Sequence, residues 1–175
     1  MIASKVLSIF LVLLAIQAIC DAADSSEYAG TYYNRKTQVA STQITKPNDV
    51  GTSKLVSFQG ANCQCANLAC SCCTGVRVKK LKFDKEICAT INYLKQDIGV
   101  GSSLKVDQKQ IWATSVSVRN PPAVCVPIPD FPAVKLCLRF HDLYTTGNGL
   151  HACVDLETHV KALPVLKLHF ACAQL

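Results

Sequence analysis

The chain has 175 residues, of which half are hydrophobic and 17% are charged, and its formal net charge is +6 at pH 7. The positive excess is modest, and no aromatic residues interleave with the lysines as single-stranded nucleic-acid sites require. We therefore expect no nucleic-acid partner.

Residues 1–20 have the parts of a secretory signal peptide. Lys5 supplies the positive charge, Val6–Ile16 is an apolar stretch, and Ala18 and Cys20 place small residues before a cleavage site. The alternative is an uncleaved anchor, but the apolar stretch is shorter than the roughly twenty residues that span a bilayer. We predict a secreted, extracellular protein without a transmembrane anchor.

Residues 21–60 are rich in serine, threonine, glutamine, asparagine and lysine, with few large aliphatic side chains. Such a segment buries too little apolar surface to offset its ordering entropy, so we predict a flexible polar N-terminal arm. Tyr28, Tyr32 and Tyr33 are the exceptions. These tyrosines mark either an adhesive or crosslinkable surface patch or an incidental grouping.

Residues 61–175 form the predicted cysteine-rich β domain, which is large enough for one core. Removal of Cys20 leaves an even number of cysteines, and in an exported chain this favours complete pairing into about five disulfides. The sequence leaves the connectivity open, although a strained vicinal bridge between Cys72 and Cys73 is disfavoured, so we expect each to have a different, distant partner. The predicted disulfide cysteines are Cys63, Cys65, Cys70, Cys72, Cys73, Cys88, Cys125, Cys137, Cys153 and Cys172.

Apolar residues in this domain recur with a period of two, which indicates strands with one buried face. The alternation is clearest in Val134–His141, Leu150–Glu157 and Leu166–Phe170. Further candidate strands are Val76–Phe83, Ile87–Leu94, Ser103–Val106, Lys109–Val118 and Val124–Ile128. Turn signals separate them at Gly99–Gly101, Asn120–Pro122, Pro127–Pro129 and Gly147–Gly149.

Seven or eight short strands with regular turns predict an all-β fold, an antiparallel β-sandwich or barrel. No helix is predicted, although Cys63–Cys73 has room for one turn. Cys88, Cys137 and Cys153 fall on the polar side of their strands, whereas Cys172 shares the side of the apolar residues. We expect Cys172 to face the core or to clamp the C-terminus, and Cys63–Cys73 to wrap over the outer face.

The cysteine-rich domain carries a series of short motifs. They are Cys70-Ser-Cys72-Cys73-Thr-Gly, Asn120-Pro-Pro with Cys125, Lys135-Leu-Cys137-Leu, Asp142-Leu, Cys153-x-Asp155-Leu-Glu157 and Cys172. Together they resemble a family of secreted arthropod proteins catalogued as a domain of unknown function. The resemblance covers about Cys63–Cys172 and implies the scaffold and secretion. It leaves the function open.

The four histidines, His141, His151, His159 and His169, fall on the polar side of the last three strands, together with Asp155 and Glu157. If these strands are neighbours, histidines such as His151 and His159 would converge with a carboxylate on zinc or copper. The alternative is a solvated outer face. No compact metal-binding spacing is present, so we expect no metal or other cofactor.

Hydrolase chemistry has weak support. His141-Asp142 lacks a serine in a recognisable nucleophile context, and a carboxylate pair would have to come from Asp142, Asp155 and Glu157. The clustered cysteines suit soft metals, but an oxidising compartment favours disulfides. The basic run with Arg77, Lys79, Lys80, Lys82 and Lys85 suits either an anionic polymer or a solvated strand.

The sequence therefore predicts a secreted, non-enzymatic, disulfide-rich β domain with no catalytic residues. We expect it to bind an extracellular partner protein, a surface polymer or a small apolar ligand. The alternative is a secreted hydrolase or metal-binding protein that uses the His/Asp/Glu face near the C-terminus.

Overall fold

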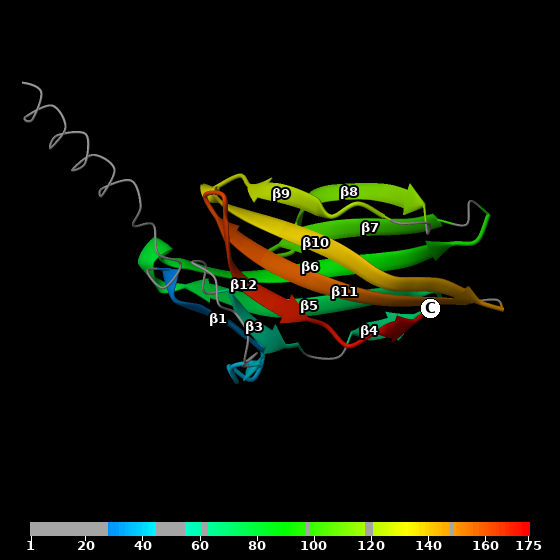
Figure 1. Ribbon diagram of the computed structural model, residues 1–175, viewed down its shortest axis with the longest axis horizontal. Helices are drawn as coiled ribbons and strands as arrows, with labels where there is room; N and C mark the ends of the chain where they lie inside the picture. Colours follow the sequence, from blue (N-terminus) through cyan, green and yellow to red (C-terminus); the bar gives the residue numbers. More distant parts are fainter. Residues whose placement is uncertain (1–27, 45–54, 61–62, 97–98, 118–120, 148) are drawn as a thin grey trace, which may run out of the picture.

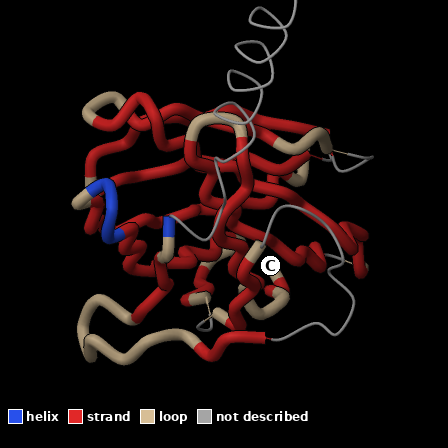
Figure 2. The backbone as a smooth tube through the Cα atoms, turned by 60° about the vertical axis from the view of Figure 1, so that its left-hand side comes forward, coloured by secondary structure: helices blue, strands red, loops and turns tan. Residues whose placement is uncertain are grey.

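The computed structural model shows a chain built almost entirely from β-strands (Figures 1 and 2). It describes residues 28–44, 55–60, 63–96, 99–117, 121–147 and 149–175. The predicted signal peptide lies outside these residues. No helix in the described ranges is long and apolar enough to cross a membrane.

The strands form two sheets that face each other (Figure 1). The first sheet has the order β1-β5-β6-β7-β8, with β4 also paired to β5, and all its pairs are antiparallel. Its strands are β1 (Gly30–Tyr33), β4 (Gln64–Ala66), β5 (Ala69–Val78), β6 (Phe83–Leu94), β7 (Gly99–Val106) and β8 (Lys109–Ser117).

The second sheet has the order β2-β3-β12-β11-β10-β9, with β13 also paired to β11. Its pairs are antiparallel except for β12 and β3, which run parallel. Its strands are β2 (Thr42–Ile44), β3 (Val56–Gln59), β9 (Val124–Ile128), β10 (Phe131–Thr146), β11 (Gly149–Val160), β12 (Leu163–His169) and β13 (Ala173–Gln174). The predicted all-β, disulfide-stapled sandwich is confirmed.

The core lies between the sheets and is made by the predicted period-two alternation. On β11, Leu150, Ala152, Val154 and Leu156 are each at most 2% exposed. The inner faces of β10 and β12 are buried in the same way, and they pack against inner-face side chains of the first sheet such as Leu104. These apolar faces supply the main driving force for folding.

Strand boundaries differ from the predictions where a turn interrupts an apolar run. The proposed strand Val76–Phe83 is wrong, because a 3-10 turn at Lys79–Leu81 separates β5 from β6 and Lys82 adopts a left-handed conformation. Gly99–Gly101 begins β7 rather than forming a turn. The segment Cys63–Cys73 forms β4 and the start of β5 instead of wrapping over an outer face.

The prediction of a flexible N-terminal arm is wrong for the described part of residues 21–60. β1 pairs with β5 in the first sheet, whereas β2 and β3 belong to the second. Tyr28, Tyr32 and Tyr33 are all less than 8% exposed, and Phe58 is 4% exposed. A few aromatic side chains bury enough area to dock a segment whose average composition is polar.

Tyr32 connects the two sheets through its hydroxyl group. From β1 it reaches across the core, where it donates to the carbonyl of Leu156 at 3.1 Å and lies 2.9 Å from Oγ1 of Thr158. Its ring meets Phe58 edge-on, with centroids 5.6 Å apart. Complete burial raises the pKa of Tyr32, so the hydroxyl stays protonated and able to donate.

All ten predicted disulfide cysteines are paired within single sheets. The bridges are Cys63–Cys72, Cys65–Cys70 and Cys73–Cys88 in the first sheet, and Cys125–Cys137 and Cys153–Cys172 in the second. Cys72 and Cys73 have different partners, as expected, but these partners are nearby rather than distant. Cys172 clamps the C-terminal segment to β11. None of the five bridges joins the two sheets.

We predict that Tyr32→Phe lowers the free energy of unfolding by about 1–3 kcal/mol, because it leaves buried acceptors without their donor. Denaturant unfolding of the oxidised protein measures this loss. The control is Tyr144→Phe, which removes a hydroxyl from a half-exposed side chain and should cost less than about 0.5 kcal/mol. Equal losses would show that the buried hydroxyl is not an inter-sheet tie.

Candidate functional site

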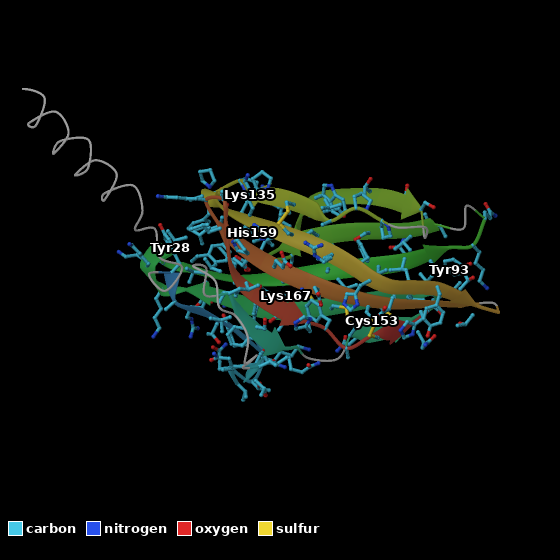
Figure 3. All side chains as sticks on the ribbon, viewed as in Figure 1. Tyr28, Tyr93, Lys135, Cys153, His159 and Lys167 are labelled. Carbon is cyan, nitrogen blue, oxygen red and sulfur yellow. A yellow bond between two sulfur atoms is a disulfide. The ribbon has the colours of Figure 1, made fainter. Side chains whose placement is uncertain are left out.

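The outer face of the second sheet carries an ionic network built on β10, β11 and β12. The sequence hypothesis that these strands are neighbours is confirmed. The register places Asp155 beside Arg139 and His169, and Glu157 beside Lys167. We call Arg139, His141, Asp155, Glu157, His159, Lys167 and His169 the carboxylate network. Figure 3 labels His159 and Lys167 on this face.

Asp155 is the centre of the network and is only 3% exposed. Its Oδ2 accepts a hydrogen bond from Lys167 Nζ at 2.9 Å. Its Oδ1 lies 2.7 Å from His169 Nδ1 and 3.2 Å from His141 Nε2. Burial opposes ionisation, but the hydrogen bond from Lys167 and the nearby charges outweigh it. The pKa of Asp155 is therefore lowered.

Glu157 is the second carboxylate and is 8% exposed. His159 Nε2 lies 3.1 Å from its Oε2, while Lys167 Nζ and Arg139 Nε each lie 3.6 Å from its Oε1. Burial again opposes ionisation, but the hydrogen bond from His159 and the charges of Lys167 and Arg139 outweigh it. The pKa of Glu157 is lowered as well.

Three of the four histidines contact the buried carboxylates, His141 and His169 at Asp155 and His159 at Glu157, whereas His151 has other partners. His141 contacts both Asp155 and the exposed Asp142, whose Oδ2 lies 3.2 Å from Nδ1. His151 instead stacks on Tyr144 and bonds to Gln174 through Nδ1 at 2.6 Å. Two histidines do meet at one carboxylate, but they are His141 and His169 at Asp155. His151 and His159 do not converge, because eight residues of one strand separate them by about 25 Å.

Two groups in the described residues bring metal-ligating atoms within 4.8 Å of one another. They are His151 with Cys153 and Cys172, and His141 with Asp142 and Cys153. Both depend on sulfur atoms of the Cys153–Cys172 disulfide. Metals prefer a thiolate to a disulfide as a sulfur ligand, so neither group is a suitable metal-binding site.

Two clefts that no sequence pattern indicated lie beside the loop between β1 and β2. The larger has a volume of about 360 Å³ and is lined chiefly by small and uncharged polar residues, among them Thr37, Ser41, Thr42, Gln59 and Thr74. A smaller cleft of about 180 Å³ shares Asn34, Cys73 and Thr74 with it and also includes Arg35, Lys36 and Glu86. These residues come together only because the loop passes from one sheet to the other.

The loop that contributes to both clefts is held by its own hydrogen bonds. Asn34 Oδ1 accepts the backbone N–H groups of Lys36 and Thr37 at 2.9 and 3.1 Å, which is a side-chain-stabilised turn. Asn34 N–H also donates to the carbonyl of Val39 at 2.8 Å. The cleft walls are therefore formed before any ligand arrives.

Comparison with protein-family models matches residues 62–175 to a domain of unknown function, DUF4773. The chain belongs to this family. The match begins next to Cys63 and covers the five disulfides, β4 to β13, the carboxylate network and part of the clefts. Comparison with curated proteins and with solved structures gave no match. Membership of DUF4773 therefore assigns no activity to the chain.

We predict that the free energy of unfolding decreases as the pH falls below the ordinary pKa values of aspartate and glutamate side chains. The pKa values of Asp155 and Glu157 are lowered in the folded state, so their ionised forms stabilise the fold at neutral pH. This contribution disappears as the pH falls through the folded-state values. Asp155→Asn should cost about 1–3 kcal/mol at neutral pH and flatten the acid dependence of the free energy of unfolding.

Asp142→Asn is the matched control, because the Asp142 side chain is 73% exposed and contacts the same histidine. Its effect on the free energy of unfolding should stay below about 0.5 kcal/mol. Denaturant titrations between pH 3 and pH 7 compare the three proteins. A wild-type pH profile unchanged by Asp155→Asn would contradict the proposed stabilising role of the ionised carboxylate.

Proposed function

We propose that this DUF4773 protein is a secreted, non-enzymatic domain that binds an extracellular protein or surface polymer in the larger cleft beside the β1–β2 loop. The observation that carries the proposal is the cleft itself. It is concave, has a volume of about 360 Å³ and is lined by hydroxyl and amide groups on a loop held by internal hydrogen bonds. Preformed sites of this kind bind without a large ordering cost.

The lining of the cleft combines polar groups with apolar surface. Thr37, Ser41, Thr42 and Gln59 present hydroxyl and amide groups that recognise peptide backbone or sugar hydroxyls. Val39, which is 65% exposed, and the exposed Ala40 add apolar contacts beside these groups. The inner faces of the sheets, where an apolar ligand would bind in a barrel, pack against each other.

The hydrolase alternative has less support from the carboxylate network. A general acid needs a pKa raised toward the working pH, whereas the pKa values of Asp155 and Glu157 are lowered. Lys167 contacts both carboxylates, which neutralises part of the charge that a reaction would use. In the described part of the chain, no serine hydroxyl is hydrogen-bonded to a histidine ring.

Secretion is testable by intact-mass analysis of the protein recovered from the medium of secreting cells. We expect a chain cleaved after residue 20 or close to it, with a mass ten hydrogens below that of its reduced form, because five disulfides are present. Retention of the full chain inside the cell, or a mass that reduction does not change, would contradict the proposal.

The cleft is testable with Thr42→Arg, which places a long charged side chain in its wall. We expect a protein or polysaccharide retained from extracellular fluid by the immobilised wild type to be lost from this variant. Thr114→Arg is the matched control, because Thr114 is an exposed residue of the distant edge strand β8. Equal retention by all three proteins would refute binding in the cleft.

A further inference from the structure

The basic run singled out in the sequence is separated by the fold into paired and exposed charges. Arg77 bonds to Asp84 at 2.9 Å, and Lys85 bonds to Asp107 at 2.7 Å. Lys79 and Lys82 remain exposed in the turn between β5 and β6. The exposed positive charges of Lys79 and Lys82 therefore lie at the turn rather than along a strand.

Two further exposed lysines come from the other sheet at the same end of the sandwich. They are Lys135 on β10 and Lys161 in the turn between β11 and β12. The Lys161 N–H donates to the carbonyl of Ala133 at 2.6 Å, which places this turn against the start of β10. Figure 3 shows Lys135 at the end of the molecule where Tyr28 also lies.

An aromatic contact joins the two turn regions across the sandwich. Phe83, the first residue of β6, meets Phe131, the first residue of β10, edge-on with ring centroids 5.1 Å apart. Lys79 N–H also donates to Ala29 next to Tyr28. We call Lys79, Lys82, Lys135 and Lys161 the basic end. Two of its lysines come from each sheet.

The acids near the basic end do not balance it. Asp84 and Asp107 are held by Arg77 and Lys85, as described above. Asp130, in the turn between β9 and β10, is the other described exposed acid of this region. Four lysines against this one acid leave a positive field over both sheets, and such a field attracts polyanions.

We propose that the basic end binds an acidic polysaccharide of the extracellular matrix, through sulfate or carboxylate groups. This inference takes its extracellular setting from the proposed function but uses a different surface from the cleft. A polymer that lies across the end contacts turns of both sheets, which are about 10 Å apart. Lysine ammonium groups bind its anionic groups as separate point charges.

The same end is poorly suited to a membrane or to single-stranded nucleic acid. Among the described residues, Val39 and Tyr144 are the exposed large apolar side chains, and both lie outside the basic end. The described residues of the basic end therefore offer no fully exposed large apolar side chain to insert into lipid. Tyr28 is buried beneath Lys80, so its ring is not a stacking platform for bases.

Heparin-affinity chromatography of the oxidised, full mature protein tests the proposal. We expect retention at physiological ionic strength and elution by higher salt. Lys79→Gln with Lys135→Gln, one lysine from each sheet, should elute at clearly lower salt. These positions avoid the left-handed backbone of Lys82 and Lys161, so the fold should be retained.

Lys36→Gln with Lys95→Gln is the matched control, because it removes the same charge from exposed lysines elsewhere. It should elute close to the wild type. Equal elution of the two double variants, or no retention of the wild type, would refute a specific basic end. Displacement from heparin by phosphatidylserine vesicles or by DNA at lower charge concentration than by heparin itself would refute the choice of polysaccharide.

The cleft variant separates this proposal from the proposed function. Thr42→Arg should bind heparin at least as well as the wild type, because it lies in the cleft and adds a positive charge. Loss of heparin binding in Thr42→Arg would place the polysaccharide in the cleft and overturn the basic end. Failure of the cleft experiment alone would leave the basic end standing.

Discussion

The contact between the two apolar sheet faces is the constraint on which the rest of the structure depends. All five disulfides lie within one sheet or the other, so they hold neighbouring strands and termini but do not hold the sheets together. That task falls to the core and to Tyr32, whose hydroxyl crosses from β1 to backbone and side-chain oxygens of the second sheet. The bridges limit the unfolded ensemble, whereas the core determines how the layers meet.

This division explains why the outer faces can carry charge without weakening the fold. The carboxylate network lies outside the core, on a sheet whose inner face is already packed. Its two buried carboxylates are each surrounded by donors from adjacent strands, which is the condition under which buried charge is tolerated. Such a network strengthens pairing among β10, β11 and β12. Binding is then left to the surfaces where turns and loops project, namely the cleft and the basic end.

The N-terminal segment shows how average composition misleads. Its polar residues outnumber the apolar ones, yet Tyr32 and Phe58 are inserted in the core, and Tyr33 covers Gly75 on the outer face of the first sheet. A Cβ at Gly75 would come within 2.4 Å of the Tyr33 ring, so only glycine allows this close approach. The signal was present as tyrosines in a polar segment, but nothing local indicated which strands would receive them. The larger cleft follows from the same docking and was unforeseen for the same reason.

The sequence by itself determined the three C-terminal strands with clear alternation, the buried face of each, and the set of cysteines available for pairing, because alternation and an even cysteine count are local or additive properties. It also placed Asp155, Glu157 and the histidines on the outer face. Only the tertiary structure decided that His141 and His169 meet at Asp155, whereas His159 contacts Glu157 and His151 bonds to Gln174. It also decided that lysines from two sheets share one end. Register and strand order bring together residues far apart in the chain, and no local pattern encodes those distances.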